Sequence, residues 1–184
     1  MSFADKVSIL RILLIPFFVS FLIAYRRFGD MYLNHIALGI FILAVITDFL
    51  DGLVARIKKE KSKIGKVIDP LADKLLLLTA FIALYFLKFS IPWWVVFVVV
   101  SRDFIILSGV MILNFLKLEV PIYPSLWGKL TTFFQMFTVL SILVNFRFSF
   151  VFWNLAVFFT IVSGIGYIIR GLKAINANNS LDYS

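Results

Sequence analysis

The chain has 184 residues, of which 62% are hydrophobic and only 15% are charged. A soluble domain of this length is about half apolar and a quarter charged, so the composition excludes an ordinary soluble domain and indicates a lipid solvent. The formal net charge of +8 fits basic loops that contact anionic headgroups, and we expect no nucleic-acid partner.

Six apolar stretches follow one another, each long enough to cross a bilayer as a helix. We therefore predict an all-α, polytopic membrane protein, a bundle of six transmembrane helices. The predicted spans cover residues 7–25, 33–51, 67–87, 92–116, 126–145 and 148–170. Turn residues and charge runs separate them, most clearly Gly29-Asp30 and the lysine-rich stretch 58–66. We expect one domain over residues 1–175 and a short disordered tail over residues 176–184.

Basic residues are divided unevenly between the two ends of these spans. Of the 18 lysines and arginines, Arg102 falls inside the fourth span. Few of the others lie at the span ends on the same side of the membrane as the first turn, Gly29-Asp30. Those few are Arg26, Arg27, Lys88 and Arg147. Positively charged loops stay in the cytoplasm, so we expect both termini and the loop after the second span to be cytoplasmic, in a protein of the cell membrane.

Four aspartates flank the loop between the second and third spans: Asp48, Asp51, Asp69 and Asp73. Residues three or four apart share one face of a helix, so each pair projects together, and an antiparallel hairpin would bring both pairs to one point. Four carboxylates in one place repel strongly unless a cation lies between them. Oxygen ligands are those that Mg²⁺ prefers, and four of them suit a site for two ions.

Other residues around this loop indicate a phosphate ligand. Gly52 and Gly65 bracket the loop and allow a ligand to approach the backbone, while Arg56 can contact a phosphate through two hydrogen bonds. The alternative is ordinary: acids are common at helix ends, and glycines are common in turns. Against it, Asp48 directly follows an apolar stretch, where a charge is costly. Metal and phosphate together at headgroup level indicate a substrate of the phospholipid type.

The pattern resembles the signature of the CDP-alcohol phosphotransferase family. The matching positions are Asp48, Asp51, Gly52, Ala55, Arg56, Gly65, Asp69 and Asp73. The resemblance implies a homodimeric membrane enzyme that moves the phosphatidyl group from CDP-diacylglycerol to an alcohol, releases CMP, and uses Mg²⁺ or Mn²⁺. It further implies that all four aspartates are metal ligands and that Asp73 is also the base that takes the proton of the alcohol. Gly52, Ala55, Arg56 and Gly65 would line the CDP site.

Basic residues elsewhere bear on which alcohol is used. Arg102 lies within the fourth span, where an ionisable residue is a functional candidate. We expect its neighbour Asp103 on a different helical face, so that the two charges need not cancel. With Arg11, Lys129 and Arg170, it could bind an acceptor that carries its own phosphate. For these last three residues the alternative is contact with lipid headgroups.

Within the family, segments 8–18 and 128–135 look like those of phosphatidylglycerophosphate synthases, which implies glycerol 3-phosphate as the acceptor. Departures stand at Asp5, where such sequences often have Asn, at Ser8, where they have Thr, and at Asp103, where Glu is expected. Arg followed by Asp in the fourth span looks like the cardiolipin synthases, whose acceptor is phosphatidylglycerol. Inositol phosphate and serine are further alternatives.

A divalent-cation transporter is the rival from another functional class, because acids inside a membrane also mark ion paths. A conduit should carry polar residues through its whole depth. The halves of these spans away from the aspartates are nearly all apolar, which favours the enzyme.

Overall fold

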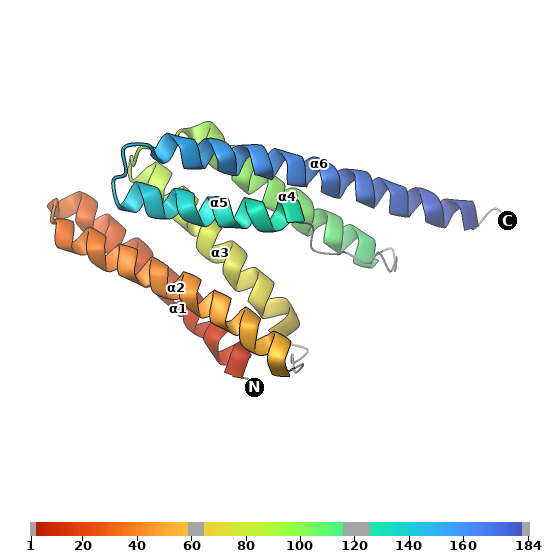
Figure 1. Cartoon of the computed structure of the whole chain (residues 1–184), viewed down its shortest axis with the longest axis horizontal. Coiled ribbons are helices and arrows are strands. Elements are labelled where there is room, and N and C mark those ends of the chain that lie inside the picture. Colours follow the sequence, from red (N-terminus) through yellow and green to blue (C-terminus); the bar gives the residue numbers. More distant parts are fainter. Residues whose placement is uncertain (1–2, 59–64, 116–125, 182–184) are drawn as a thin grey trace. The chain divides into compact units, whose positions relative to one another are not determined.

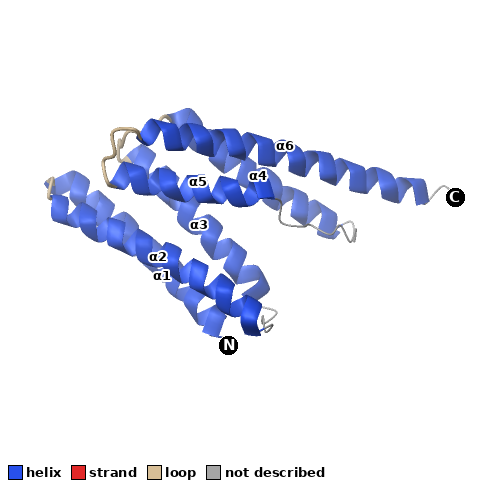
Figure 2. Cartoon of the chain, viewed as in Figure 1, coloured by secondary structure: helices blue, strands red, loops and turns tan. Residues whose placement is uncertain are grey.

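The structure is a computed structural model that describes residues 3–58, 65–115 and 126–181, with side chains described at positions 7–49, 74–106, 108–109 and 126–171. Within these residues every regular element is an α-helix (Figures 1 and 2). The helices are α1 (Phe3–Phe28), α2 (Met31–Lys58), α3 (Gly65–Phe86), α4 (Trp93–Phe115), α5 (Leu126–Leu143) and α6 (Ser149–Leu181). Each corresponds to one predicted span, so the all-helical prediction is confirmed.

The apolar composition of these helices identifies a membrane protein. Among the described residues, four helical stretches are long and apolar enough to cross a bilayer: Val7–Phe28, Met31–Phe49, Leu126–Leu143 and Ser149–Gly171. Large apolar side chains such as Phe17, Phe97 and Phe158 are exposed on the helix surfaces. So much exposed apolar surface would be unfavourable in water, and lipid is the solvent that accepts it.

Three helices extend well beyond their predicted spans: α1 at both ends, α2 chiefly at its C-terminal end, and α6 at its C-terminal end. We expected the second span to end at residue 51 and Gly52 to lie in the loop, but α2 continues to Lys58, so Gly52 is a helical position. A single glycine costs a helix about 1 kcal/mol, which is too little to end it when the following residues are good helix formers. At the end of the chain, α6 continues to Leu181 where the sequence predicts a disordered tail from residue 176, and residues 182–184 lie outside the described part.

The chain forms two compact units, and the first comprises residues 1–91 and 136–149. In it, α1 packs against both α2 and α3. Buried residues on the facing helices recur at intervals of three, four or seven positions: Ser8, Arg11, Phe18 and Leu22 on α1, and Asn34, Ala37, Phe41 and Ala44 on α2. This spacing places them on one face of each helix. The rings of Phe18 and Phe41 meet in this interface, with centroids 5.6 Å apart.

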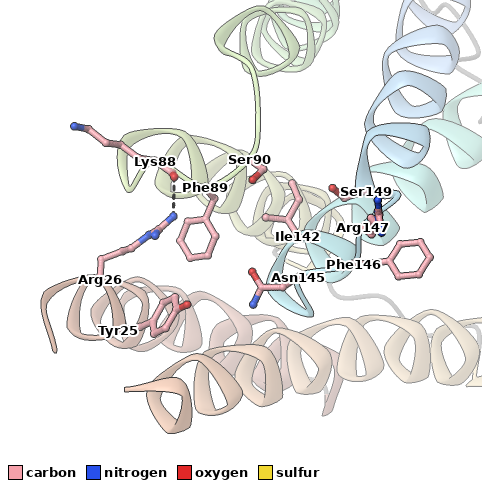
Figure 3. Close-up of a pocket in the computed structure, with 10 residues that line it drawn as sticks. All are labelled: Tyr25, Arg26, Lys88, Phe89, Ser90, Ile142, Asn145, Phe146, Arg147 and Ser149. Atoms are coloured by element: carbon pink, nitrogen blue, oxygen red, sulfur yellow. Dashed lines mark hydrogen bonds between the residues drawn. The ribbon is translucent and has the colours of Figure 1, made fainter. Parts of the chain in front are cut away.

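Polar contacts stabilise the end of the first unit that contains the α1–α2 turn. The side-chain amide of Asn34 donates a hydrogen bond of 2.8 Å to the carbonyl oxygen of Leu143 at the end of α5. The guanidinium of Arg26 donates at 2.7 Å to the carbonyl oxygen of Lys88, which follows α3, and lies 4.1 Å from the centroid of the Phe89 ring (Figure 3). These bonds satisfy carbonyl groups that the helix ends leave without partners.

The second unit comprises residues 92–135 and 150–184, which hold α4, the first part of α5, and α6. Trp94 meets the edge of Trp153 with centroids 5.3 Å apart. At Gly109 on α4, a Cβ would lie 2.9 Å from a ring carbon of the Tyr167 side chain, which reaches across from α6. The absence of a side chain at Gly109 therefore leaves room for the Tyr167 ring, as small residues leave room for neighbours in other membrane bundles.

Candidate active site

Asp48 is the one predicted metal ligand whose side chain is described, and it is paired with an arginine. Nη1 of Arg11 on α1 lies 3.2 Å from Oδ1 of Asp48 on α2. The Arg11 side chain is fully buried, while 31% of the Asp48 side chain remains exposed. Arg11 therefore does not extend to lipid headgroups, and that alternative is wrong for this residue. The Arg11 guanidinium contacts the Asp48 carboxylate, part of which remains exposed.

The antiparallel arrangement of α1 and α2 explains this pairing. The helices are joined by two residues, and Gly29 takes a positive φ of 71° that suits a tight turn. Arg11 stands as far before Phe28, the end of α1, as Asp48 stands after Met31, the start of α2. The two residues therefore lie at the same height. Each also continues the buried stripe of its helix, Arg11 three residues after Ser8 and Asp48 four residues after Ala44.

The remaining residues of the predicted pattern have described backbone but no described side chains. They are Asp51, Gly52, Ala55 and Arg56 on α2, and Gly65, Asp69 and Asp73 on α3. Among the side chains that are described, no three His, Cys, Asp or Glu groups come together as a metal site. The convergence of the four aspartates therefore stays a prediction.

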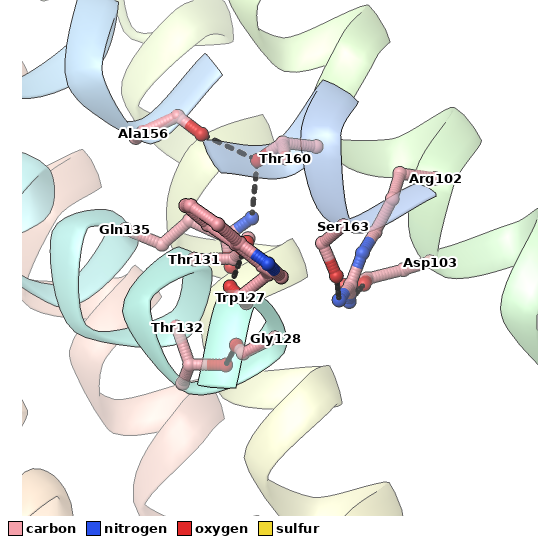
Figure 4. A network of polar contacts seen from close by, with 10 residues as sticks. All are labelled: Arg102, Asp103, Trp127, Gly128, Thr131, Thr132, Gln135, Ala156, Thr160 and Ser163. Carbon is pink, nitrogen blue, oxygen red and sulfur yellow. Dashed lines mark hydrogen bonds and ion pairs between the residues drawn. The ribbon is translucent and has the colours of Figure 1, made fainter. Parts of the chain in front are cut away.

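Arg102 lies buried in α4 within a polar cluster (Figure 4). Its Nη1 lies 2.7 Å from Oδ1 of Asp103, and its Nη2 donates at 2.8 Å to Oγ of Ser163 on α6. The expectation that Arg102 and Asp103 point to different faces is therefore wrong. The long arginine side chain reaches the neighbouring carboxylate because a buried charge without a partner costs several kcal/mol. The role of Arg102 in acceptor binding stays a prediction.

Polar residues on α5 and α6 belong to the same region of the second unit, and the sequence analysis did not single them out. Nε2 of Gln135 donates at 3.3 Å to Oγ1 of Thr160, which in turn donates at 2.6 Å to the carbonyl oxygen of Ala156 (Figure 4). A signal for them does exist in the sequence. Thr160, Ser163 and Tyr167 recur at intervals of four residues or fewer in an apolar helix, which predicts a polar stripe on one face.

Lys129 and Arg170 are both exposed. Nε of Arg170 donates at 2.9 Å to the carbonyl oxygen of Gly166 in the preceding turn of α6. These positions suit a substrate phosphate and a lipid headgroup equally well, so both interpretations of the two residues stand.

A sequence model of CDP-alcohol phosphatidyltransferases matches residues 1–162, which is most of the chain. The chain belongs to this family.

Among its relatives is a CDP-diacylglycerol–glycerol-3-phosphate 3-phosphatidyltransferase of Bacillus subtilis, 34% identical over 95% of this chain and 97% of that protein. A protein of the same name from Aquifex aeolicus is 28% identical over 95% of this chain and 98% of its own length. A CMP-forming cardiolipin synthase of Rattus norvegicus is 29% identical over 77% of this chain and 54% of its own length. Relatives with both kinds of name thus occur within one family.

The ion pair between Arg11 and Asp48 predicts energetic coupling between α1 and α2. In detergent solution, Arg11→Gln and Asp48→Asn should each lower the free energy of unfolding, since each leaves a partner uncompensated. The double variant should lose less than the sum, with a coupling free energy of about 1–3 kcal/mol. Arg170→Gln, at an exposed site, serves as the control and should change stability little. Additive losses in the double variant would contradict the pairing.

Proposed function

We propose that this chain transfers the phosphatidyl group of CDP-diacylglycerol to glycerol 3-phosphate, forming phosphatidylglycerophosphate and releasing CMP. The observation that carries the proposal is the complete eight-residue pattern from Asp48 to Asp73 in a chain of this family. The names of the Bacillus subtilis and Aquifex aeolicus relatives, which align over nearly their whole lengths, support this acceptor.

The buried stripes of the first unit support a common site for the four aspartates. On α2 the buried positions 37, 41 and 44 lead to Asp48, and the same spacing continues to Asp51. On α3 the buried positions 84, 80 and 77, followed backwards, lead to residues 73 and 69. Since α1 packs against both helices, we infer that both pairs of carboxylates face α1. This placement rests on helical spacing.

The donor set suits a hard divalent cation. Asp48 combines a half-buried position with an exposed side, as a metal ligand requires, and Asp51, Asp69 and Asp73 offer further carboxylate oxygens. We propose that these residues hold two Mg²⁺ or Mn²⁺ ions, which when bound would neutralise the pyrophosphate and polarise the attacked phosphorus. Arg11 keeps Asp48 in position through their ion pair.

Individual residues of the pattern have separate roles in the proposed reaction. Asp73 accepts the proton of the acceptor hydroxyl as its oxygen forms a bond to the phosphorus of the phosphatidyl group. The bond from that phosphorus to the oxygen of CMP breaks, and CMP leaves with the electron pair. Arg56 binds a phosphate of the nucleotide through its guanidinium. Gly52 and Gly65, which lack a Cβ, and Ala55, which has only a methyl group, leave room for the CDP group.

The cations of the second unit are candidates for the phosphate of glycerol 3-phosphate. Lys129 and Arg170 are exposed and can meet a soluble dianion, while Arg102 is neutralised by Asp103. Arg11, which the sequence grouped with these cations, is engaged by Asp48. A second candidate acceptor is phosphatidylglycerol, favoured by the Arg102-Asp103 sequence and by the similarity to the Rattus norvegicus cardiolipin synthase.

We further propose that α3 and α4 also cross the membrane, which gives six spans in one domain over residues 1–175 with both termini and the active site at the cytoplasmic face of the cell membrane. The active form is a homodimer, as the family resemblance implies. The distribution of lysines and arginines between the two ends of the helices supports this topology.

Single cysteines can test the topology, because the chain has none of its own. In intact cells a membrane-impermeant maleimide should label Ser90→Cys, at the end predicted to be external. It should label Ser184→Cys only after the membrane is opened. Labelling of the C-terminal cysteine in intact cells would reverse the proposed orientation.

The acceptor can be identified with the purified protein, CDP-diacylglycerol and Mg²⁺. Glycerol 3-phosphate, inositol phosphate, serine and phosphatidylglycerol are offered separately, and CMP release and the lipid product are measured. We expect CMP and phosphatidylglycerophosphate with glycerol 3-phosphate alone. Cardiolipin from phosphatidylglycerol would establish the second candidate, and absence of CMP with every acceptor, together with metal flux in liposomes, would indicate a transporter.

Asp73→Asn should retain the fold and the binding of CDP-diacylglycerol but lower turnover by about 10²–10⁴-fold, because a general base contributes that much to a rate. The matched control is Asp30→Asn in the α1–α2 turn, where the side-chain oxygen accepts a hydrogen bond of 2.9 Å from the backbone N–H of Tyr32. Asparagine can keep that bond, so this control should retain full CMP release. Near-normal turnover in Asp73→Asn would remove Asp73 from the mechanism.

A further inference from the structure

A second polar site lies in the first unit, at the end of α1 away from Arg11. It is a hollow of about 450 Å³ whose walls come from the last turn of α1, the α3–α4 connection and the α5–α6 connection (Figure 3). Arg26 lines it, and 15 residues of helix, or about 22 Å, separate Arg26 from Arg11. The hollow is therefore distinct from the candidate active site.

The charged residues that line this hollow are all basic: Arg26, Lys88 and Arg147. Among the described residues, none of these cations forms an ion pair with a carboxylate. They are three of the four basic residues that the sequence places on this side of the membrane, Arg27 being the fourth. Because loops on this side of a membrane protein are usually poor in cations, their gathering around one hollow calls for a local cause.

The hydrogen-bond donors of the hollow match a phosphate group. In Figure 3, Arg26 and Arg147 lie on opposite sides with Asn145 between them, while the ammonium of Lys88 extends outward from the rim. The Arg26 guanidinium has five N–H donors and is held in place by the Lys88 carbonyl and the Phe89 ring, which leaves donors for a ligand. Hydroxyl groups of Ser90 and Ser149 also line the hollow. Guanidinium, amide and hydroxyl donors around one space are the chemistry that binds phosphate oxygens.

We propose that this hollow binds a phosphate group, carried by a phospholipid headgroup of the leaflet opposite the active site or present as free phosphate. A volume of about 450 Å³ is within the range of about 300–1,000 Å³ that small-molecule sites occupy, and it exceeds what a lone phosphate needs. The site also lies where helices end, with Tyr25 and Phe89 beside it, and the topology proposed above puts this end at the depth of the headgroups. A lipid headgroup is therefore the source that fits best.

Binding can be measured on the full-length protein purified in an uncharged maltoside detergent. The midpoint of thermal unfolding is followed while short-chain phosphatidylglycerol, short-chain phosphatidylcholine or inorganic phosphate is added separately. Arg147→Gln removes one charged donor without touching the bond between Arg26 and Lys88. Arg27→Gln is the matched control, because Arg27 is an exposed arginine of the same helix end that does not line the hollow.

We expect both lipids to raise the unfolding midpoint, and Arg147→Gln to weaken their apparent affinity about tenfold, which is the effect of losing one charge-assisted hydrogen bond. Arg27→Gln should bind like the unaltered protein. A response to inorganic phosphate that is also lost in Arg147→Gln identifies free phosphate as a ligand, and a response to the lipids alone identifies a headgroup site. Equal responses of the two variants would overturn the proposal. An unchanged unfolding midpoint of Arg147→Gln without ligand verifies its fold, so the binding result stands whether or not the proposed reaction occurs.

Discussion

The ion pair between Arg11 and Asp48 is the interaction on which the candidate site depends. It places two opposite charges at the same height in an apolar hairpin, where either charge alone would be costly. The buried guanidinium fixes the position of a carboxylate whose other side stays open. A ligand for a metal ion needs both a fixed position and an open side. Helix α1 carries no aspartate of the pattern, but its Arg11 fixes the position of Asp48.

The two ends of the first unit carry different sets of polar groups. At one end Asp48 leads into a sequence that contains both aspartates and lysines, and at the other Arg26, Lys88 and Arg147 line a hollow without an acid in its lining. The apolar middle, with Phe18 against Phe41, separates them. This polarity follows from helices that are antiparallel and uniformly apolar along their length, because polar groups can then be satisfied only at the ends.

In the second unit, the charged residues whose side chains are described are either buried as an ion pair or exposed as single cations. Arg102 and Asp103 are buried together as an ion pair, and Arg102 also donates a hydrogen bond to Ser163, so the cluster has no net charge. Lys129 and Arg170 remain at the surface. These residues are the candidates for acceptor binding that we propose above, in a chain whose relatives are named for different acceptors.

The sequence by itself determined the number and type of the helices and the family, because apolar length and the spacing of eight residues are local properties of the chain. It misjudged the extent of α2 and the direction of Asp103, since the end of a helix and the partner of a long side chain depend on what lies beside them in space. Tertiary structure alone decided that Arg11 meets Asp48, that Ser163 meets Arg102, and that three basic residues from separate segments line one hollow. Such contacts join residues far apart in the chain, and no local pattern encodes them.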